Sequence, residues 1–359
     1  MNPFQNGNGS IFTSGDNLNN NSIHDSLAVA DAWLNALVNK NKVPGLSITV
    51  IKNDHVLLQK GYGFAEIETR TPVDPLKTVF RIASASKPIA ASALAQMVEE
   101  GTLCLDTSFN DYVPYYPQKS AYFTIRQLAG HTAGIRGYKG KEYALNKPFS
   151  IKEGIEIFKH DDLLFTPGSD YFYTSYGWVL VSLAMQEASS TPFSDYVENT
   201  LLKPLGLFDT YPELPDEVNE YRATFYSKKI SGFSKAIAVN NLYKLAGGGY
   251  LSTSADLAKL GQAYLDRKIA EETIINQFIT SQKIGEIPTY YGLGWQSSLD
   301  KKGRAYYGHL GNGVGGYSNF FIYPKLKIVI AILINCTDPK VQSELDAIID
   351  ILISAETIS

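Results

Sequence analysis

The sequence predicts an α+β fold in which both ends of the chain build one antiparallel sheet of five or more strands, with an all-helical lobe inserted between them. Strand patterns gather near the N-terminus and again toward the C-terminus, whereas helical patterns fill most of the middle. One helical pattern precedes the first strands and another follows the last. We therefore expect N- and C-terminal helices to flank the sheet.

The first elements are a helix and two strands. Apolar residues recur at helical spacing over residues 26–38, which predicts an amphipathic helix. Residues 46–52 and 56–63 carry strand patterns, and Asn53-Asp54 between them is typical of a two-residue hairpin turn.

A buried helix is predicted over residues 88–100. Proline is tolerated in the first helical turn, where Pro88 stands, and Gly101 is placed as a C-terminal cap. The apolar face follows helical spacing and the opposite face is mostly small, as in a helix buried on all sides. Residues 102–240 then alternate loops rich in Pro, Tyr and Gly with short helical patterns, among them residues 176–187 and 193–202.

The C-terminal part returns to strand patterns, and a helical pattern at residues 341–353 closes it. The strand patterns are at residues 290–297, 304–309, 317–323 and 327–335. These boundaries predict three regions. They are a disordered leader at residues 1–22, a sheet domain made of residues 23–83 and 241–359, and an inserted helical lobe at residues 84–240.

Composition excludes several classes of function. The 359 residues carry a formal net charge of −4 with acidic and basic residues mixed throughout, so neither nucleic acid nor a polybasic membrane contact is expected as a partner. Cys104 and Cys336 lie far apart, and the five histidines show no metal-ligand spacing. We expect no metal and no cofactor, and a small molecule or peptide as the substrate.

The sequence gives limited information on localisation. Residues 1–22 are rich in Asn, Gly and Ser and lack the apolar core of a secretory signal, which favours the cytoplasm unless a signal has been removed. No stretch is long and apolar enough to predict an integral membrane span, since the run at residues 328–333 has only strand length.

Ser84 and Lys87 are the most informative residues of the chain. Residues three apart share a helix face, so Lys87 at the start of the buried helix can reach the Ser84 hydroxyl and take its proton. Burial makes a lysine less basic, as such a role requires. Ser298 and Lys301 have the same spacing, but they stand in a polar run that no helix follows, which predicts a turn.

Two further segments carry candidate site residues. Tyr173 and Ser175 stand at the start of a predicted helix. The phenol of Tyr173 can act as a base or proton relay if a cation such as Lys87 lowers its pKa; the alternative is an aromatic packing residue. Residues 308–316 contain Gly-x-Gly-x-x-Gly, but a strand follows, which argues against a dinucleotide site. We interpret this segment as a strand whose glycines let a substrate approach, with His309 pointing into the site.

Ser84-x-x-Lys87, Tyr173-x-Ser175 and His309-x-Gly311 occur in this order with three other motifs. Those are Val43-Pro44-Gly45, His131-Thr132-Ala133-Gly134 and Tyr291-Gly292-Leu293-Gly294-Trp295. Over about residues 26–340 the combination resembles the serine β-lactamase and penicillin-binding-protein superfamily. Within it, the chain is most similar to the class C type, which includes DD-peptidases, family VIII esterases and lactamase-beta-like serine proteases. The β-lactamase/transpeptidase-like fold is what this resemblance implies.

The resemblance also implies roles for individual residues. Ser84 would be the acyl-forming nucleophile, Lys87 its base, and Tyr173 the residue that passes protons to the leaving group and later activates water. The backbone N–H groups of Ser84 and Asn312 would form the oxyanion hole. Gly311 and Asn312, with Leu310, would hold the substrate as an added edge strand.

Two positions depart from the commonest family pattern. Ser175 stands where Asn is usual, and His309 stands where class C β-lactamases carry Lys. A largely neutral histidine binds a carboxylate less well than a lysine does, so the site should bind substrate carboxylates weakly. The alternative is that Arg136 or Arg222 supplies the missing cation. The sequence thus predicts a serine hydrolase acting on amide or peptide bonds, for example those of a D-residue peptide or cell-wall fragment. A carboxylesterase or acyltransferase with the same residues, and a catalytically silent binding scaffold, are the alternatives.

Overall fold

The computed structural model describes residues 14–214 and 219–354, and the chain divides into two compact units. Residues 1–42 and 340–359 form the first unit, and residues 43–339 form the second. The first unit contains α1 (Ser14–Asn39) and α10 (Gln342–Ser354), which contact each other. α1 begins inside the predicted leader, and residues 1–13 of that leader lie outside the described residues. The predicted division into a sheet domain and an inserted lobe stays a prediction.

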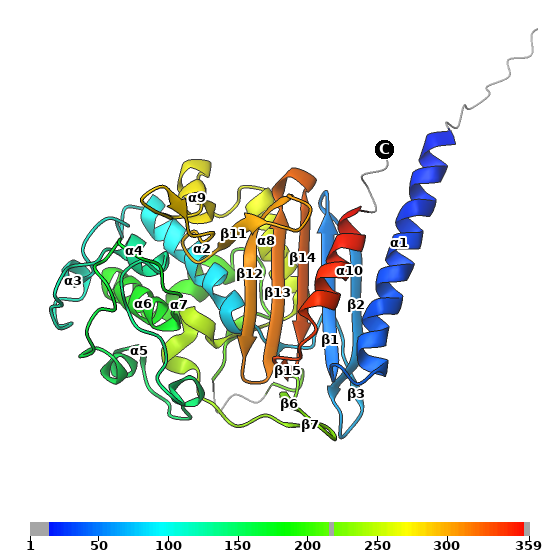
Figure 1. The fold of residues 1–359 in the computed structure, drawn as a ribbon, viewed down its shortest axis with the longest axis horizontal. Helices are drawn as coiled ribbons and strands as arrows, with labels where there is room; N and C mark the ends of the chain where they lie inside the picture. The colour runs from blue at the N-terminus through cyan, green and yellow to red at the C-terminus, as the bar shows by residue number, and fades with distance from the viewer. Residues whose placement is uncertain (1–13, 215–218, 355–359) are drawn as a thin grey trace, which may run out of the picture. The chain divides into compact units, whose positions relative to one another are not determined.

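The described part of the second unit is organised around a seven-stranded sheet in which every neighbouring pair is antiparallel. In spatial order the strands are β11 (Gln296–Leu299), β12 (Ala305–Gly313), β13 (Gly316–Tyr323), β14 (Ile328–Ile334), β1 (Gly45–Lys52), β2 (His55–Glu66) and β3 (Thr71–Pro72). Early and late segments of the chain meet where β1 pairs with β14 (Figure 1). The predicted antiparallel sheet built from both ends of the chain is confirmed.

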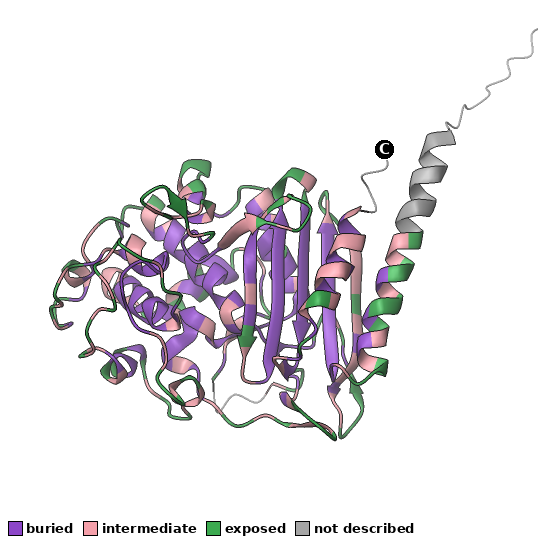
Figure 2. Ribbon diagram, viewed as in Figure 1, coloured by how far each residue is buried: buried purple, intermediate pink, exposed green. Residues whose placement is uncertain are grey.

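The middle of this sheet is buried. Every residue of β13 and β14 is buried, as Figure 2 shows for the central strands. Helix α8 (Ser254–Leu265) packs on β1 and β14, and a Cβ at Gly261 would lie 2.4 Å from a Val329 methyl group. The helix therefore lies very close to the strands, and the sheet is a rigid support for the residues on its strands.

Helices occupy most of residues 83–202. Figure 1 shows them grouped beside the β11–β12 edge of the sheet. They are η1 (Ala83–Ala85), α2 (Ser86–Glu99), α3 (Phe109–Tyr112), α4 (Ile125–Ala129), η2 (Glu142–Ala144), α5 (Ile151–Gly154), η3 (Ile155–Ile157), α6 (Ser175–Ser189), α7 (Phe193–Val197) and η4 (Glu198–Leu202). The sequence predicted helices in this region, and α2 and α6 agree with the predicted ranges to within two residues.

Short strands and turns make up the remaining described elements. One small sheet contains β4 (Phe80–Arg81), β8 (Tyr250–Ser252) and β5 (Tyr211–Pro212). Another contains β15 (Cys336–Thr337), β6 (Tyr226–Lys229) and β7 (Gly232–Lys235), so residues 84–240 are not wholly helical. The last are η5 (Leu242–Lys244), η6 (Leu245–Gly249), α9 (Glu272–Ile279), β9 (Lys283–Ile284), β10 (Ile287–Pro288) and η7 (Pro324–Leu326).

Two local predictions are confirmed in detail. Asn53 and Asp54 both have positive φ, as the two-residue turn between β1 and β2 requires. Gly101 has a φ of 74° just after α2, the left-handed conformation of a helix C-cap. The strand predicted from residue 290 instead begins at Gln296, because Gly292 N–H donates to Trp295 O and closes a turn.

None of the helices that the structure describes has both the length and the apolar character that crossing a bilayer requires.

Candidate active site

Ser84 lies in η1, a single turn that leads directly into α2. Ala83, the residue before it, has a φ of 47°, a conformation that residues other than glycine rarely adopt. The start of α2 is fixed from the side, because Ser86 Oγ accepts the N–H of Tyr250 at 3.1 Å. The half-buried Ser84 side chain therefore stands at the mouth of a buried helix, where the sequence placed it.

Lys87 is fully buried one helical turn after Ser84. Its Nζ donates to Ser84 Oγ at 3.2 Å and to Gly247 O at 2.7 Å. Burial lowers the pKa of Lys87 to about 7, so the amine is neutral in a large fraction of molecules near pH 7. In that state its lone pair is available to take a proton from Ser84.

Tyr173 lies on the other side of Ser84. Its hydroxyl donates to Ser84 Oγ at 2.9 Å, and Lys87 Nζ lies 4.8 Å from the centre of its ring. The expectation that Lys87 lowers the pKa of Tyr173 is wrong, because burial raises the pKa of Tyr173 and outweighs the hydrogen bond to Ser84. Tyr173 is therefore a neutral donor in the resting site, and Lys87 is the group that can act as the base.

The end of β12 presents backbone N–H groups to the space beside Ser84. Because a two-residue loop joins β12 and β13, Gly313 and Gly316 form a hydrogen-bonded pair, and hydrogen-bonded and free pairs then alternate along the strand. The N–H groups of Asn312 and Leu310 thus face away from β13. Leu310 agrees with this, since its N–H reaches Gln296 Oε1 at 3.1 Å. Asn312 is two residues further along the strand, so its N–H points to the same side and can contribute to an oxyanion hole.

Gly311 brings β12 against the Ser84 turn. A Cβ at Gly311 would lie 2.3 Å from Ile82 O and 3.1 Å from Ser84 N, and Ser318 Oγ donates to the same Ile82 carbonyl at 2.7 Å. We expected the glycines of this strand to make room for a substrate. At Gly311 the missing side chain makes room for the turn that carries the nucleophile.

The His309 ring lies 6.0 Å from that of Tyr173; it is almost completely buried and is not among the residues that line the cavity beside Ser84. Its Nδ1 contacts Leu310 O at 2.7 Å; since a carbonyl only accepts, Nδ1 carries the proton and Nε2 accepts the Tyr291 hydroxyl at 2.9 Å. Burial and the charge of Lys87 lower the pKa of His309 to about 3. His309 therefore contributes no positive charge to the site at neutral pH.

His131 supports Tyr173 from below. Its backbone has a φ of 62°, its Nδ1 accepts the N–H of Thr174 at 3.3 Å, and its ring lies 4.5 Å from that of Tyr173 and 4.6 Å from that of Tyr291. These contacts identify His131 as a positioning residue for Tyr173, a role that its motif in the sequence did not reveal.

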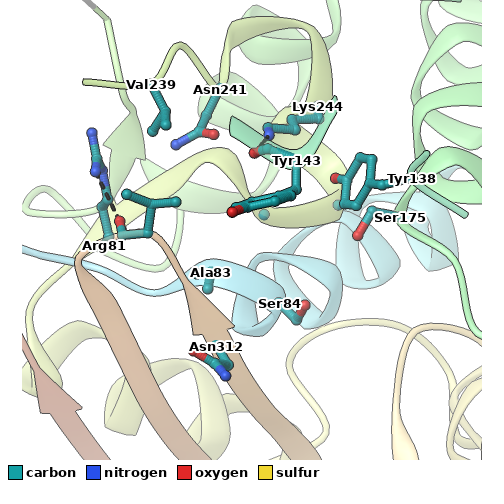
Figure 3. A pocket seen from close by; sticks show the side chains of 14 residues that line it. Arg81, Ala83, Ser84, Tyr138, Tyr143, Ser175, Val239, Asn241, Lys244 and Asn312 are labelled. Atoms are coloured by element: carbon teal, nitrogen blue, oxygen red, sulfur yellow. Dashed lines mark hydrogen bonds between the residues drawn. The ribbon is translucent and has the colours of Figure 1, made fainter. Parts of the chain in front are cut away.

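A cavity of about 110 Å³ opens beside Ser84 (Figure 3). Its lining includes Arg81, Ser84, Ser175, Asn241, Lys244 and Asn312. Figure 3 shows Ser175 next to Tyr138 on one wall. Gly247 packs against Ser175 and its carbonyl accepts a hydrogen bond from Lys87, so this glycine turn orients the base.

The cations that line this cavity are not those that the sequence suggested. Arg136 pairs with Glu142 and Asp161 at 2.6 Å each and is not among the lining residues. Arg222 does not line the cavity either. Arg81 and Lys244 do, and sequence reasoning missed both, because nothing in the local pattern shows that they reach Ser84.

Among residues 14–214 and 219–354, no group of three or more His, Cys, Asp and Glu side chains is placed to hold a metal ion.

Comparison with known proteins agrees with the fold. The family model described as Beta-lactamase matches residues 30–353, so the chain belongs to the Beta-lactamase family. The human serine beta-lactamase-like protein LACTB, mitochondrial, is 29% identical over 293 residues, which are 62% of this chain and 53% of that protein. This chain therefore spans about half the length of that relative.

Solved structures show the same fold. The octameric penicillin-binding protein homologue from Pyrococcus abyssi is 26% identical with a TM-score of 0.77, over 87% of this chain and 74% of that one. The D-amino acid amidase from Ochrobactrum anthropi SV3, complexed with L-phenylalanine amide, is 20% identical with a TM-score of 0.81. It covers 94% of this chain and 99% of its own, and at this identity it supports the fold alone.

Proposed function

We propose that the chain is a serine hydrolase that works through an acyl-enzyme at Ser84. The observation that carries this proposal is the pair of contacts to one oxygen: Ser84 Oγ lies 3.2 Å from Lys87 Nζ and 2.9 Å from the Tyr173 hydroxyl. A serine nucleophile needs a base to activate it and an acid to protonate the leaving group. Both groups are within reach, and membership of the Beta-lactamase family supports the assignment.

In the acylation step, Ser84 Oγ attacks the substrate carbonyl as its proton passes to the neutral amine of Lys87. The tetrahedral intermediate carries a negative oxygen, which the N–H groups of Ser84 and Asn312 stabilise. Tyr173 then gives its hydroxyl proton to the leaving group and takes a proton back from Lys87. The bond to the leaving group breaks, and the acyl group stays on Ser84 as an ester.

Deacylation repeats these steps with water in place of the leaving group. Tyr173 passes its own proton to the neutral amine of Lys87 and accepts one from water as the water oxygen attacks the ester carbonyl. The same oxyanion hole holds the second tetrahedral intermediate. Its collapse releases the acid and returns the proton to Ser84 Oγ, so no cofactor takes part in the cycle.

The proposed substrate contains an amide or peptide bond and is, in its most specific form, a D-residue peptide or a cell-wall fragment. The proposed enzyme type is the class C/DD-peptidase type. The penicillin-binding protein homologue at 26% identity supports this choice. A carboxylesterase is the second candidate. It is favoured by the buried, neutral state of His309, because a substrate with no carboxylate near the leaving group does not need a cation there.

The experiment is a comparison of Ser84→Ala with Ser298→Ala, since Ser298 has the same Ser-x-x-Lys spacing but lies on β11. Turnover of a p-nitrophenyl ester and of a D-amino acid amide is measured for both variants and the unchanged protein. We expect loss of turnover in Ser84→Ala and none in Ser298→Ala. Activity that survives in folded Ser84→Ala would rule out this nucleophile, and no turnover by the unchanged protein would favour the scaffold alternative.

A further inference from the structure

The wall of the cavity opposite Ser84 carries a buried cation. Lys244 ends η5, immediately before the η6 turn whose Gly247 carbonyl holds Lys87. Figure 3 shows Lys244 and Asn241 across the cavity from Ser84. The Lys244 side chain is thus built into the same space as the nucleophile, although the proposed reaction gives it no role.

The contacts of this ammonium are with neutral groups. Lys244 is 5% exposed, its Nζ donates to Tyr143 O at 2.7 Å, and it lies 5.3 Å from the centre of the Tyr138 ring. Among residues 14–214 and 219–354, no carboxylate lies within ion-pair distance of Lys244 Nζ. An ammonium has three donors, so the carbonyl leaves donor capacity for a ligand.

Glu213, the acidic residue beside this wall of the cavity, already has partners of its own. Glu213 accepts three hydrogen bonds from Arg81, at 2.6 to 3.0 Å, and a fourth from Asn241 at 3.0 Å. Arg81 and Glu213 therefore neutralise each other, while Lys244 supplies the remaining positive charge of this wall. Arg81 is tied down further by donating to Val314 O at 2.8 Å.

A buried ammonium without a counter-ion is unfavourable, and Lys244 shows this. Burial and the charge of Arg81 lower the pKa of Lys244 to about 8, although the charge of Glu213 offsets part of the shift, and most molecules are still charged at neutral pH. A bound anion would offset the cost of burying this charge. The cavity of about 110 Å³ has room for several small groups, because a single water needs about 10–15 Å³.

In the proposed mechanism, this cavity receives the acyl side of the substrate. Ser84, Ser175 and Asn312 line it, but Tyr173, the proposed acid for the leaving group, does not. We propose that Lys244 forms a subsite for a carboxylate at the far end of the substrate's acyl group, so that the preferred substrates are esters or amides of short dicarboxylic acids. This inference rests on the proposed function and names the substrate class of the same site.

The test compares two p-nitrophenyl esters of equal chain length, the glutarate half-ester, which ends in a carboxylate, and the neutral valerate. The quantity is the ratio of their kcat/KM values. We expect the unchanged protein to favour the glutarate, and Lys244→Met to lower the ratio about 10- to 100-fold, the usual effect of losing a charge-assisted hydrogen bond. Lys244→Arg, which keeps the charge, should keep most of the preference.

Lys119→Met is the matched control. Lys119 is also a partly buried lysine with a lowered pKa, and it donates to the carbonyls of Lys159 and Asp161, but it does not line the cavity. Its replacement should leave the ratio unchanged. If Lys244→Met lowers turnover of both esters equally, Lys244 has a structural role and the inference is wrong.

A binding measurement separates this inference from the proposed hydrolysis. Glutarate and valerate are titrated into Ser84→Ala protein by calorimetry, with and without Lys244→Met. Tighter binding of glutarate that depends on Lys244 supports the subsite even if the chain hydrolyses neither ester. Equal affinity for the two ligands overturns the subsite even if Ser84 proves to be the nucleophile.

Discussion

Lowering the pH is expected to switch the site off through Lys87. With a pKa of about 7, the neutral fraction of this amine is about one half at pH 7 and about 1% at pH 5. The rate of acylation should therefore fall about 50-fold between these values, with a tenfold loss per pH unit in the acid range. A lysine with the ordinary pKa of 10.5 would be only about 0.03% neutral at pH 7, so burial raises the supply of base about 10³-fold.

The two histidines of the site cannot produce this acid limb. Burial lowers the pKa of His309 to about 3 and that of His131 well below its ordinary value, so neither ring titrates near pH 7. Tyr173 has a raised pKa and stays protonated near pH 7 as well. A limb near pH 7 in kcat/KM therefore reports on Lys87 alone among these residues.

The assay is kcat/KM for a short-chain p-nitrophenyl ester from pH 5 to pH 9, corrected for spontaneous hydrolysis. Lys87→Arg is the informative variant, because a guanidinium keeps a positive charge but does not give up its proton in this range. We expect it to lose activity at every pH. A flat profile down to pH 5, or an unchanged limb in Lys87→Arg, would refute the assignment of Lys87 as the base.

Four further outcomes follow from the same geometry. At pH 7, Lys87→Met should have a free energy of unfolding higher than that of the unchanged protein by at most about 5 kcal/mol, because the folded state disfavours the charged lysine. This gain should shrink as the pH rises from about 7 to 10.5, where the lysine loses its charge in the unfolded state too. An equal gain at pH 6 and pH 10 in urea titrations would contradict this. Tyr173→Phe should slow turnover about 10²- to 10⁴-fold without adding to the loss in Lys87→Met, whereas additive losses in the double variant would separate the two residues. Because His309 is neutral, kcat/KM should be higher for a simple ester or a D-amino acid amide, which have no carboxylate beside the leaving group, than for a chromogenic cephalosporin, and a clear preference for the cephalosporin would show that another group binds the carboxylate. Gly311→Ala should lower both the melting temperature and activity, since its Cβ would lie 2.3 Å from Ile82 O; a fully active, stable variant would mean that β12 can move away from the Ser84 turn.

The sequence predicts best where a local pattern has one structural solution. The hairpin at Asn53-Asp54 and the helix end at Gly101 depend on backbone conformations that few residues adopt, so residue type and position were enough. Ser84 and Lys87 belong to the same group, because helical spacing brings residues three apart together. The contact of 3.2 Å between their side chains agrees with that geometry.

Contacts between distant parts of the chain were not predictable in this way. Gly247, which accepts from Lys87, is 160 residues away in sequence, and no periodicity links the two. Lys244 looks like an ordinary lysine until the fold buries it beside the cavity. The direction of the Tyr173 pKa shift also depended on the fold, because burial of the hydroxyl raises the pKa and outweighs the hydrogen bond to Ser84.

The most direct test of the central claim is the intact mass of the protein after incubation with a fluorophosphonate probe and, separately, with penicillin, followed by peptide mapping. An acyl-enzyme mechanism predicts one covalent adduct with the probe, mapped to Ser84, absent from Ser84→Ala and retained in Ser298→Ala. A penicillin adduct at the same residue would place β-lactams among the accepted substrates. An adduct that persists in Ser84→Ala, or no adduct with either reagent in folded protein, would contradict the account.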